Sequence, residues 1–181
     1  MGSKYSGMID YSLIYHFKNF YIMTNPIPLS LDALDGRILD SLQRDASLTN
    51  QALAALVHAS PATCLRRVKR LSLAGLIQKQ VAILRPDAFG AQLTAIVEVT
   101  LDRQGDEHQI AFETLAGQEE SVLQCYRVSP GPDFVLVIQV RDMPGYHALA
   151  HRLFAGHSNV RNVKSFFSIY RSKFETRVAR A

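Results

Sequence analysis

The sequence predicts an α+β protein in which three helices are followed by strands and helices in alternation. From residue 30 to residue 76, apolar residues recur at the three- and four-residue spacing of amphipathic helices. From residue 92 onward, runs of apolar–polar alternation, typical of half-buried strands, take turns with helical spacing. With 181 residues, 48% hydrophobic and 20% charged, the chain is long enough for two small domains with packed cores.

The first predicted helix covers residues 30–44. Asp32 and Asp35 fall in its first turns, where the helix dipole favours carboxylates. Its apolar residues share one face: Leu31, Leu34, Ile38, Leu39 and Leu42. We therefore expect this helix to pack one side against its neighbours.

Residues 49–74 have the pattern of a second and a third helix joined by a short turn. Thr49 is a good N-cap for the second helix, and the three residues 58–60 separate it from the third. Ser60-Pro61 begins the third helix, because serine caps it and proline at the first helical position loses no needed hydrogen bond. Gly75 then ends it. Together with the first helix, this pattern predicts a helix-turn-helix domain.

The third helix has two sides of different chemistry. One side is predicted to pack and consists of Cys64, Leu65, Val68 and Leu71. The other can enter a major groove, where arginine suits phosphates and guanine edges, and consists of Thr63, Arg66, Arg67 and Arg70. We expect Ser60 and Lys69 to contact phosphates nearby. An ordinary surface helix with solvated charges is the alternative, and the short Ser-Pro turn favours DNA.

The formal net charge of +4 is mildly basic, which is compatible with a nucleic-acid partner. The segment from residue 63 to residue 85 has no acidic residue but carries Arg66, Arg67, Lys69, Arg70, Lys79 and Arg85. A local basic stripe of this kind is stronger evidence for DNA binding than the total charge.

We expect a cytoplasmic protein that associates with the nucleoid. Cys64 and Cys125 are far apart in the sequence and allow no disulfide framework, which fits a reducing cytosol. No apolar run approaches the ~20 residues that a membrane-spanning helix needs. We therefore expect no membrane partner.

Two segments lie outside the predicted domains. Residues 1–28 hold four of the seven tyrosines and lack the features of a signal peptide. We hypothesise that they are a flexible or non-native extension and that translation starts at Met23; an aromatic arm that packs on a partner chain is the alternative. Residues 77–91 are predicted to be an extended wing or linker between a helix-turn-helix domain at 29–76 and a second domain at 92–181.

The second domain has six predicted elements in the order strand, helix, strand, strand, helix, strand. They cover residues 93–101, 106–115, 122–128, 134–140, 146–154 and 163–169. This order predicts a ferredoxin-like βαββαβ sandwich with both helices on one face of the sheet. The other face, with Ile96, Phe166 and Tyr170, needs a partner to cover it, which favours dimerisation.

From about Leu31 to the C-terminus, the chain resembles bacterial and archaeal regulators of the leucine-responsive/AsnC family. The most specific part is the run from Ser60 to Ile77, with Ser60-Pro61, Cys64, Arg66-Arg67-Val68-Lys69-Arg70-Leu71 and Gly75. The resemblance implies a helix-turn-helix domain joined to an effector-binding domain in a regulator of amino-acid metabolism. It also implies homodimers that pair through their sheets and assemble further, for example to an octamer, with a small amino acid bound near a dimer–dimer contact.

The resemblance places the effector site at the loop between the two central strands. This loop reads Val128-Ser129-Pro130-Gly131-Pro132-Asp133-Phe134. Asp133 matches the family's acidic residue, whereas the family's glycine falls at Pro130 and Gly131 comes one place late. We expect Ser129, Gly131 and Asp133 to contact the effector, with loop amides holding its α-carboxylate and Asp133 its α-ammonium group. A plain turn is the alternative.

The sequence contains no Gly-rich phosphate loop, no GxSxG and no paired-carboxylate motif, so we expect no enzyme activity and no cofactor. His147 and His151 have the i, i+4 spacing of zinc ligands, but no HExxH motif or cysteine partner accompanies them, and we expect no metal. An enzyme similar to the sirohaem decarboxylases, which share this layout, is the alternative; the basic third helix argues against it.

The sequence therefore predicts a sequence-specific transcriptional regulator that binds double-stranded DNA. A dimer would place two third helices about one helical turn apart on a pseudo-palindromic operator. A nucleoid-organising protein with little sequence preference is a further alternative, which a steep salt dependence and a weak preference among DNA sequences would reveal.

Overall fold

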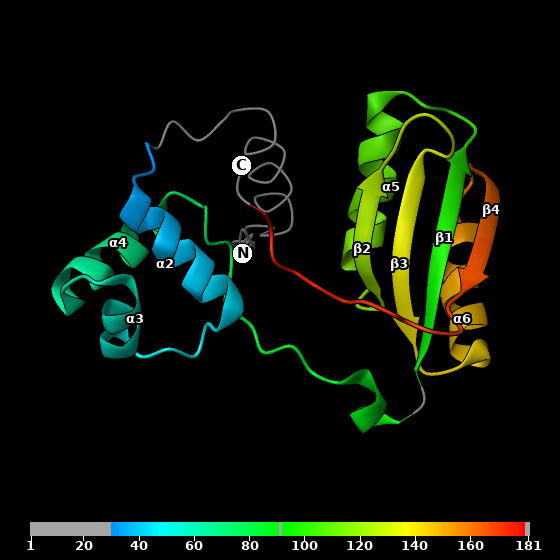
Figure 1. Ribbon diagram of the computed structural model, residues 1–181. Helices are drawn as coiled ribbons and strands as arrows, with labels where there is room; N and C mark the ends of the chain where they lie inside the picture. The colour runs from blue at the N-terminus through cyan, green and yellow to red at the C-terminus, as the bar shows by residue number, and fades with distance from the viewer. Residues whose placement is uncertain (1–29, 91, 180–181) are drawn as a thin grey trace, which may run out of the picture. The chain divides into compact units, whose positions relative to one another are not determined.

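The computed structural model describes residues 30–90 and 92–179, which form two compact units (Figure 1). Residues 30–83 together with residues 173–179 make the helical unit, and the other described residues make the sheet unit. Our hypothesis for residues 1–28 lies outside the described residues. In the described part of the chain, no helix is long and apolar enough to cross a membrane.

The helical unit contains three helices close to the predicted spans: α2 (Ala33–Arg44), α3 (Asn50–Val57) and α4 (Pro61–Leu73). Asp32 and Asp35 form a reciprocal capping box at the start of α2. Thr49 and Ser60 each accept a hydrogen bond from a backbone N–H in the first turn of α3 and α4. The core between the helices consists of Ile38, Leu53, Ala54, Val57, Cys64 and Leu71.

The sheet unit follows the predicted order of elements: β1 (Leu93–Leu101), α5 (Asp106–Gln118), β2 (Val122–Arg127), β3 (Phe134–Val140), α6 (Met143–Ala150) and β4 (Val160–Phe167). A π-helical turn, η2 (His151–Ala155), extends α6, and a 3-10 turn, η1 (Pro86–Phe89), precedes β1. The strands pair antiparallel in the order β2-β3-β1-β4. The predicted ferredoxin-like sandwich is confirmed.

Both α5 and α6 cover one face of this sheet (Figure 1). Side chains alternate along a strand, so every second residue of the two central strands points toward the helices. These residues are buried with Phe112 and Leu149, and they are Ala95, Val97, Val99, Leu101, Phe134, Leu136, Ile138 and Val140. On the opposite face, Ile96 and Phe166 pair across β1 and β4 and are 44% and 43% exposed. Tyr170 lies beyond the end of β4.

The segment predicted as a wing or linker has no regular structure from residue 78 to residue 85. At the other end of the chain, residues 173–179 group with the helical unit. The side chain of Gln43 on α2 makes two hydrogen bonds to this segment. Its amide donates to the carbonyl of Val178 at 3.3 Å, and its Oε1 accepts from the Val178 N–H at 2.7 Å.

Candidate nucleic-acid interface and effector loop

Helix α4 presents a mixed apolar and basic side to solvent. Cys64 and Leu71 are fully buried in the core of the helical unit, which fixes the rotation of α4 about its axis. The side that remains exposed includes Ala62, Leu65, Arg66 and Lys69. Our prediction that Leu65 packs in the core is wrong, because this side chain is 62% exposed.

Arg67 and Arg70 occupy the inner side of α4 instead, where they meet the fully buried carboxylate of Asp35. Nη1 of Arg67 lies 3.2 Å and 3.1 Å from the two carboxylate oxygens of Asp35, and 2.7 Å from Oδ2 of Asp32. Nη2 of Arg70 also donates to Asp35 Oδ2. We call these four residues the arginine–aspartate cluster. It ties the start of α2 to the middle of α4.

Hydrogen bonds move the pKa values of Asp32 and Arg67 further from neutrality. The backbone N–H of Asp35 and the guanidinium of Arg67 hold the pKa of Asp32 below its ordinary value. The hydrogen bond to Asp32 in turn raises the pKa of Arg67. Both groups are therefore ionised at neutral pH, and the attraction between them persists throughout the physiological range.

The six residues predicted to contact DNA thus fall into two groups. Arg66 and Lys69 are exposed, and neither makes an ion pair with any residue that the structure describes. Ser60 and Thr63 lie at the start of α4, where the Ser60 hydroxyl donates to the Thr63 hydroxyl at 2.9 Å. The other two residues belong to the arginine–aspartate cluster and point toward α2.

Side-chain hydrogen bonds to the backbone fix how the three helices meet. Nε of Arg37 on α2 donates to the carbonyl of Val57 at 3.2 Å, and the Asn50 amide on α3 donates to the carbonyl of Pro61 at 2.8 Å. Between α3 and α4, His58 takes a left-handed φ of 54°, which ends α3 and turns the chain. These contacts connect all three helices and set which side of α4 is exposed.

The predicted effector loop separates its three candidate residues. Ser129 and Gly131 are exposed, and Gly131 has a φ of 125°, a conformation that favours glycine. Asp133 is only 8% exposed, and its Oδ2 accepts the backbone N–H of Leu101 at 2.7 Å. Its own N–H donates to the carbonyl of Val99 at 2.9 Å. Asp133 thus joins the start of β3 to the end of β1, while the loop tip faces solvent.

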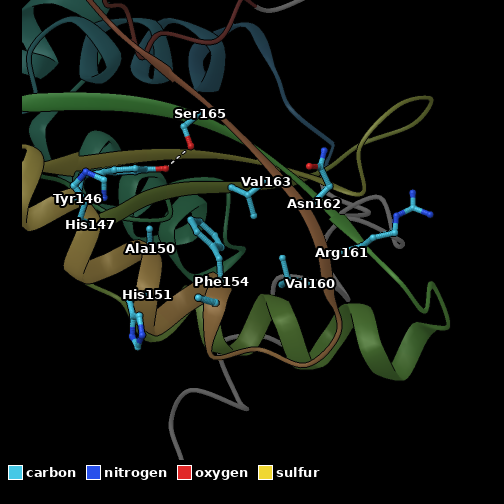
Figure 2. A pocket seen from close by; sticks show the side chains of 11 residues that line it. Tyr146, His147, Ala150, His151, Phe154, Val160, Arg161, Asn162, Val163 and Ser165 are labelled. Carbon is cyan, nitrogen blue, oxygen red and sulfur yellow. Dashed lines mark hydrogen bonds between the residues drawn. The ribbon is translucent and has the colours of Figure 1, made fainter.

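A cavity of about 560 Å³ lies between the α6–η2 helix and β4 (Figure 2). The hydroxyls of Tyr146 and Ser165 are hydrogen bonded to each other along its wall, whereas Arg161 extends away from the other lining side chains (Figure 2). His147 and His151, the pair with zinc-ligand spacing, also line it. Among the described residues, no group of three or more His, Cys, Asp or Glu side chains could hold a metal ion.

Two family models match the chain, one over the three helices and one from β1 through residue 178. A winged helix-turn-helix DNA-binding model matches residues 31–78, and a model of the Lrp/AsnC ligand binding domain matches residues 94–178. The chain is 38% identical over 160 residues to an uncharacterised HTH-type transcriptional regulator of Haemophilus influenzae, covering 88% of this chain and 92% of the relative. It is also 38% identical over 119 residues to the leucine-responsive regulatory protein of Escherichia coli, covering 66% and 73%.

The chain belongs to the Lrp/AsnC family. A solved structure supports the same assignment: a transcriptional regulator from Neisseria meningitidis in complex with L-Met superimposes with a TM-score of 0.76. That protein is 29% identical in sequence, and the match covers 83% of this chain and 97% of the other. The resemblance predicted from the run between Ser60 and Ile77 is thereby confirmed.

In this Lrp/AsnC-family chain, sequence reasoning missed the partners of Asp35. We attributed the aspartates at the start of α2 to the helix dipole. A stronger signal was present, because Asp35 shares the buried side of its helix with Ile38 and Leu42 at i+3 and i+7. A carboxylate on an apolar face needs cations or hydrogen-bond donors from a neighbouring element, and the arginines of α4 supply them.

Proposed function

We propose that this Lrp/AsnC-family chain is a transcriptional regulator that reads a pseudo-palindromic DNA operator through α4. The exposed side of α4 is the observation that carries the proposal. Arg66 and Lys69 project from a helix whose rotation is fixed by its buried core, so these side chains can enter a major groove without rearrangement. Ser60 and Thr63 lie at the helix N-terminus, which favours a phosphate.

In this proposal Arg67 and Arg70 act indirectly. Their contacts with Asp35 orient α4, and the DNA contacts come from the residues on the opposite side of the helix. This division differs from the assignment that the spacing of the arginines favoured. Substituting Arg67 or Arg70 should therefore lower the stability of the helical unit. Substituting Arg66 should lower the affinity for DNA.

We propose that a second copy of the chain covers the open face of the sheet. On this face, Ile96 pairs with Phe166 on one side and with Val137 on the other, and Tyr126 is 51% exposed. An apolar surface of this kind favours pairing of sheets, and a two-fold dimer presents two α4 helices to a two-fold operator. Further assembly, for example to an octamer, belongs to the same proposal.

We further propose that a small amino acid binds at the loop of residues 129–133 and shifts the affinity for DNA. The exposure of Ser129 and Gly131 supports this site, because the loop amides there can hold a carboxylate. The regulator from Neisseria meningitidis was solved with L-Met, which makes amino acids the first compounds to test. Asp133 is expected to shape the loop through Leu101 as well as to face the ligand.

The test is a fluorescence-anisotropy titration of the DNA upstream of the chain's own gene against unrelated DNA of equal length at physiological salt. We expect preferential binding with a Kd of about 10⁻⁸ M or tighter. Arg66→Ala should weaken operator binding about 5- to 150-fold, the range for losing one base contact. Arg141→Ala, at an exposed arginine of the sheet unit, is the matched control and should leave affinity unchanged.

Other outcomes separate the alternatives. Equal, strongly salt-dependent binding to both DNAs would instead indicate a nucleoid-organising protein. If neither DNA binds, the proposal is overturned. With binding established, the titration is repeated with L-Met, L-Leu and L-Asn, and an affinity change that Ser129→Ala abolishes would locate the effector at the loop.

A further inference from the structure

Leu65 is a large apolar side chain on the side of α4 that the proposed function directs toward DNA. It is 62% exposed, and it lies in the N-terminal half of a helix that spans residues 61–73. Arg66 follows it directly, and Lys69 lies one turn further on the same side. Ala62, one turn before it, is a small exposed residue.

The packing of the helical unit holds Leu65 in this outward position. Turning α4 to bury it would withdraw Cys64 and Leu71, which are both fully buried. The same rotation would also separate Arg67 from the carboxylate of Asp35, 3.1 Å away. The exposure of Leu65 is therefore a consequence of the fold, and nothing in the described helical unit covers it.

The chemistry of the major groove supplies a partner for such a side chain. Among the groups that base pairs present there, the C5-methyl of thymine is the apolar one, and the others are hydrogen-bond donors and acceptors. The cations next to Leu65, Arg66 and Lys69, suit the phosphates and guanine edges that surround a thymine. Helices of this kind contact bases with their N-terminal residues, which is where Leu65 lies.

We propose that Leu65 determines specificity by contacting the methyl group of a thymine in each operator half-site. This inference rests on the proposed function and goes beyond it by naming the residue and the base. It predicts that replacing thymine by deoxyuridine, which lacks only this methyl group, lowers the affinity of the protein at one operator position. It also predicts that this loss of affinity depends on Leu65.

The experiment replaces each thymine of one half-site in turn by deoxyuridine and measures affinity by fluorescence anisotropy. For the unaltered protein we expect about a fourfold loss at one position, from ~0.8 kcal/mol for burying one methyl-sized group. Leu65→Ala should bind the thymine and deoxyuridine versions equally. Leu65→Met retains an apolar contact and should retain part of the discrimination.

Leu73→Ala is the matched control, because this leucine is 80% exposed in the last turn of the same helix. The Leu73→Ala variant should still bind the thymine operator about four times more tightly than the deoxyuridine operator. Circular dichroism melts of all three variants establish that each is folded, as expected for substitutions at exposed positions.

The outcomes distinguish this inference from the proposed function. If specific binding is found but no position distinguishes thymine from deoxyuridine, the inference about Leu65 is overturned and the regulator function stands. The same holds if Leu65→Ala keeps the fourfold ratio, since another residue then reads the methyl group. If operator and unrelated DNA bind equally, both are overturned.

Discussion

Asp35 of the helical unit and Asp133 of the sheet unit are both buried, but different groups hold them. Asp35 accepts hydrogen bonds from two guanidinium groups of α4 and from the backbone N–H of Asp32. Asp133 accepts the backbone N–H of Leu101 at 2.7 Å and makes no ion pair with a described residue. Asp35 thus connects α2 to side chains of α4, whereas Asp133 connects the start of β3 to the backbone at the end of β1.

The difference follows from the cores on which the two units are built. The core of the helical unit has six buried residues, whereas that of the sheet unit has fourteen and includes Phe112 and Phe134. Because the apolar core of the helical unit is small, the orientation of α4 depends more on contacts between charged groups. The helical unit should therefore be sensitive to charge, and the sheet unit to backbone geometry.

The sharpest test of this difference is Asp35→Asn. The amide keeps the shape of the carboxylate but leaves Arg70 without a counter-charge and Arg67 with that of Asp32 alone. We expect a loss of about 3 kcal/mol in the stability of the helical unit, the lower end for breaking a buried ion pair, because both arginines remain partly exposed. Amide hydrogen exchange should accelerate in α4 and stay unchanged in β1.

Arg66→Ala is the control for this variant, since it removes a cation of α4 that lies outside the cluster. It should leave amide exchange in the helical unit at the level of the unaltered protein. If both variants accelerate amide exchange in α4 equally, the arginine–aspartate cluster has no special role. The proposed difference between the helical unit and the sheet unit would then be wrong.

The second test is Asp133→Ala, which leaves the N–H of Leu101 without its acceptor inside the sheet unit. We expect a loss of about 2 kcal/mol, typical of a buried hydrogen bond to a charged group. Asp133→Asn keeps an oxygen that can accept this bond, so it should cost less. Thermal melts followed by amide exchange in β1 measure both variants. If Asn is as damaging as Ala, the charge of Asp133 matters and the contrast with Asp35 disappears.

The order of elements could be predicted from the sequence because its signals are local. Asp32, Thr49 and Ser60 cap the helices within one turn, and the alternation around Val97 and Leu136 identifies strands without reference to the rest of the chain. Such patterns predict the elements correctly because a helix cap depends only on residues nearby in the sequence, and a strand pattern only on having one buried face.

The candidate site was predicted less completely, because its geometry depends on contacts between distant residues. The spacing of the arginines in α4 predicts Arg66, Arg67 and Arg70 on one side, whereas the structure turns Arg67 and Arg70 toward Asp35 and leaves Arg66 exposed. That depends on Asp35, which lies 32 residues before Arg67 in the sequence. Leu65 is assigned to the core for the same reason: its apolar character is visible in the sequence, whereas the contacts that draw Arg67 and Arg70 to Asp35 on the inner side are not.

The third test concerns residues 173–179, whose attachment to the helical unit had no signal in the sequence. Gln43→Ala removes both hydrogen bonds to Val178, and because this contact is exposed we expect a loss of only about 1 kcal/mol. The Val178 amide should exchange several-fold faster, whereas exchange in α4 should hardly change. Gln51→Ala, at an exposed glutamine of α3, is the control. Unchanged exchange of the Val178 amide in the Gln43 variant would show that other contacts hold this segment.

The smallest expected effect is the pH dependence contributed by Asp32. Its pKa is lowered from 3.8 in the folded chain by the backbone N–H of Asp35 and by Arg67. A lowered pKa means that Asp32 contributes stability above the unfolded value and that this contribution disappears as the pH falls through the folded value. Melts of the unaltered protein and of Asp32→Asn, which keeps a good N-cap, should therefore differ by a constant amount between about pH 5 and pH 7. The two should converge only when the pH falls below the folded pKa of Asp32, which lies under 3.8. About 1 M salt should shrink the difference, because Asp32 is half exposed and its attraction to Arg67 is screened. A difference that persists at low pH would mean that the charge of Asp32 has no part in holding α2 against α4, and that Asp35 alone makes the helical unit sensitive to charge.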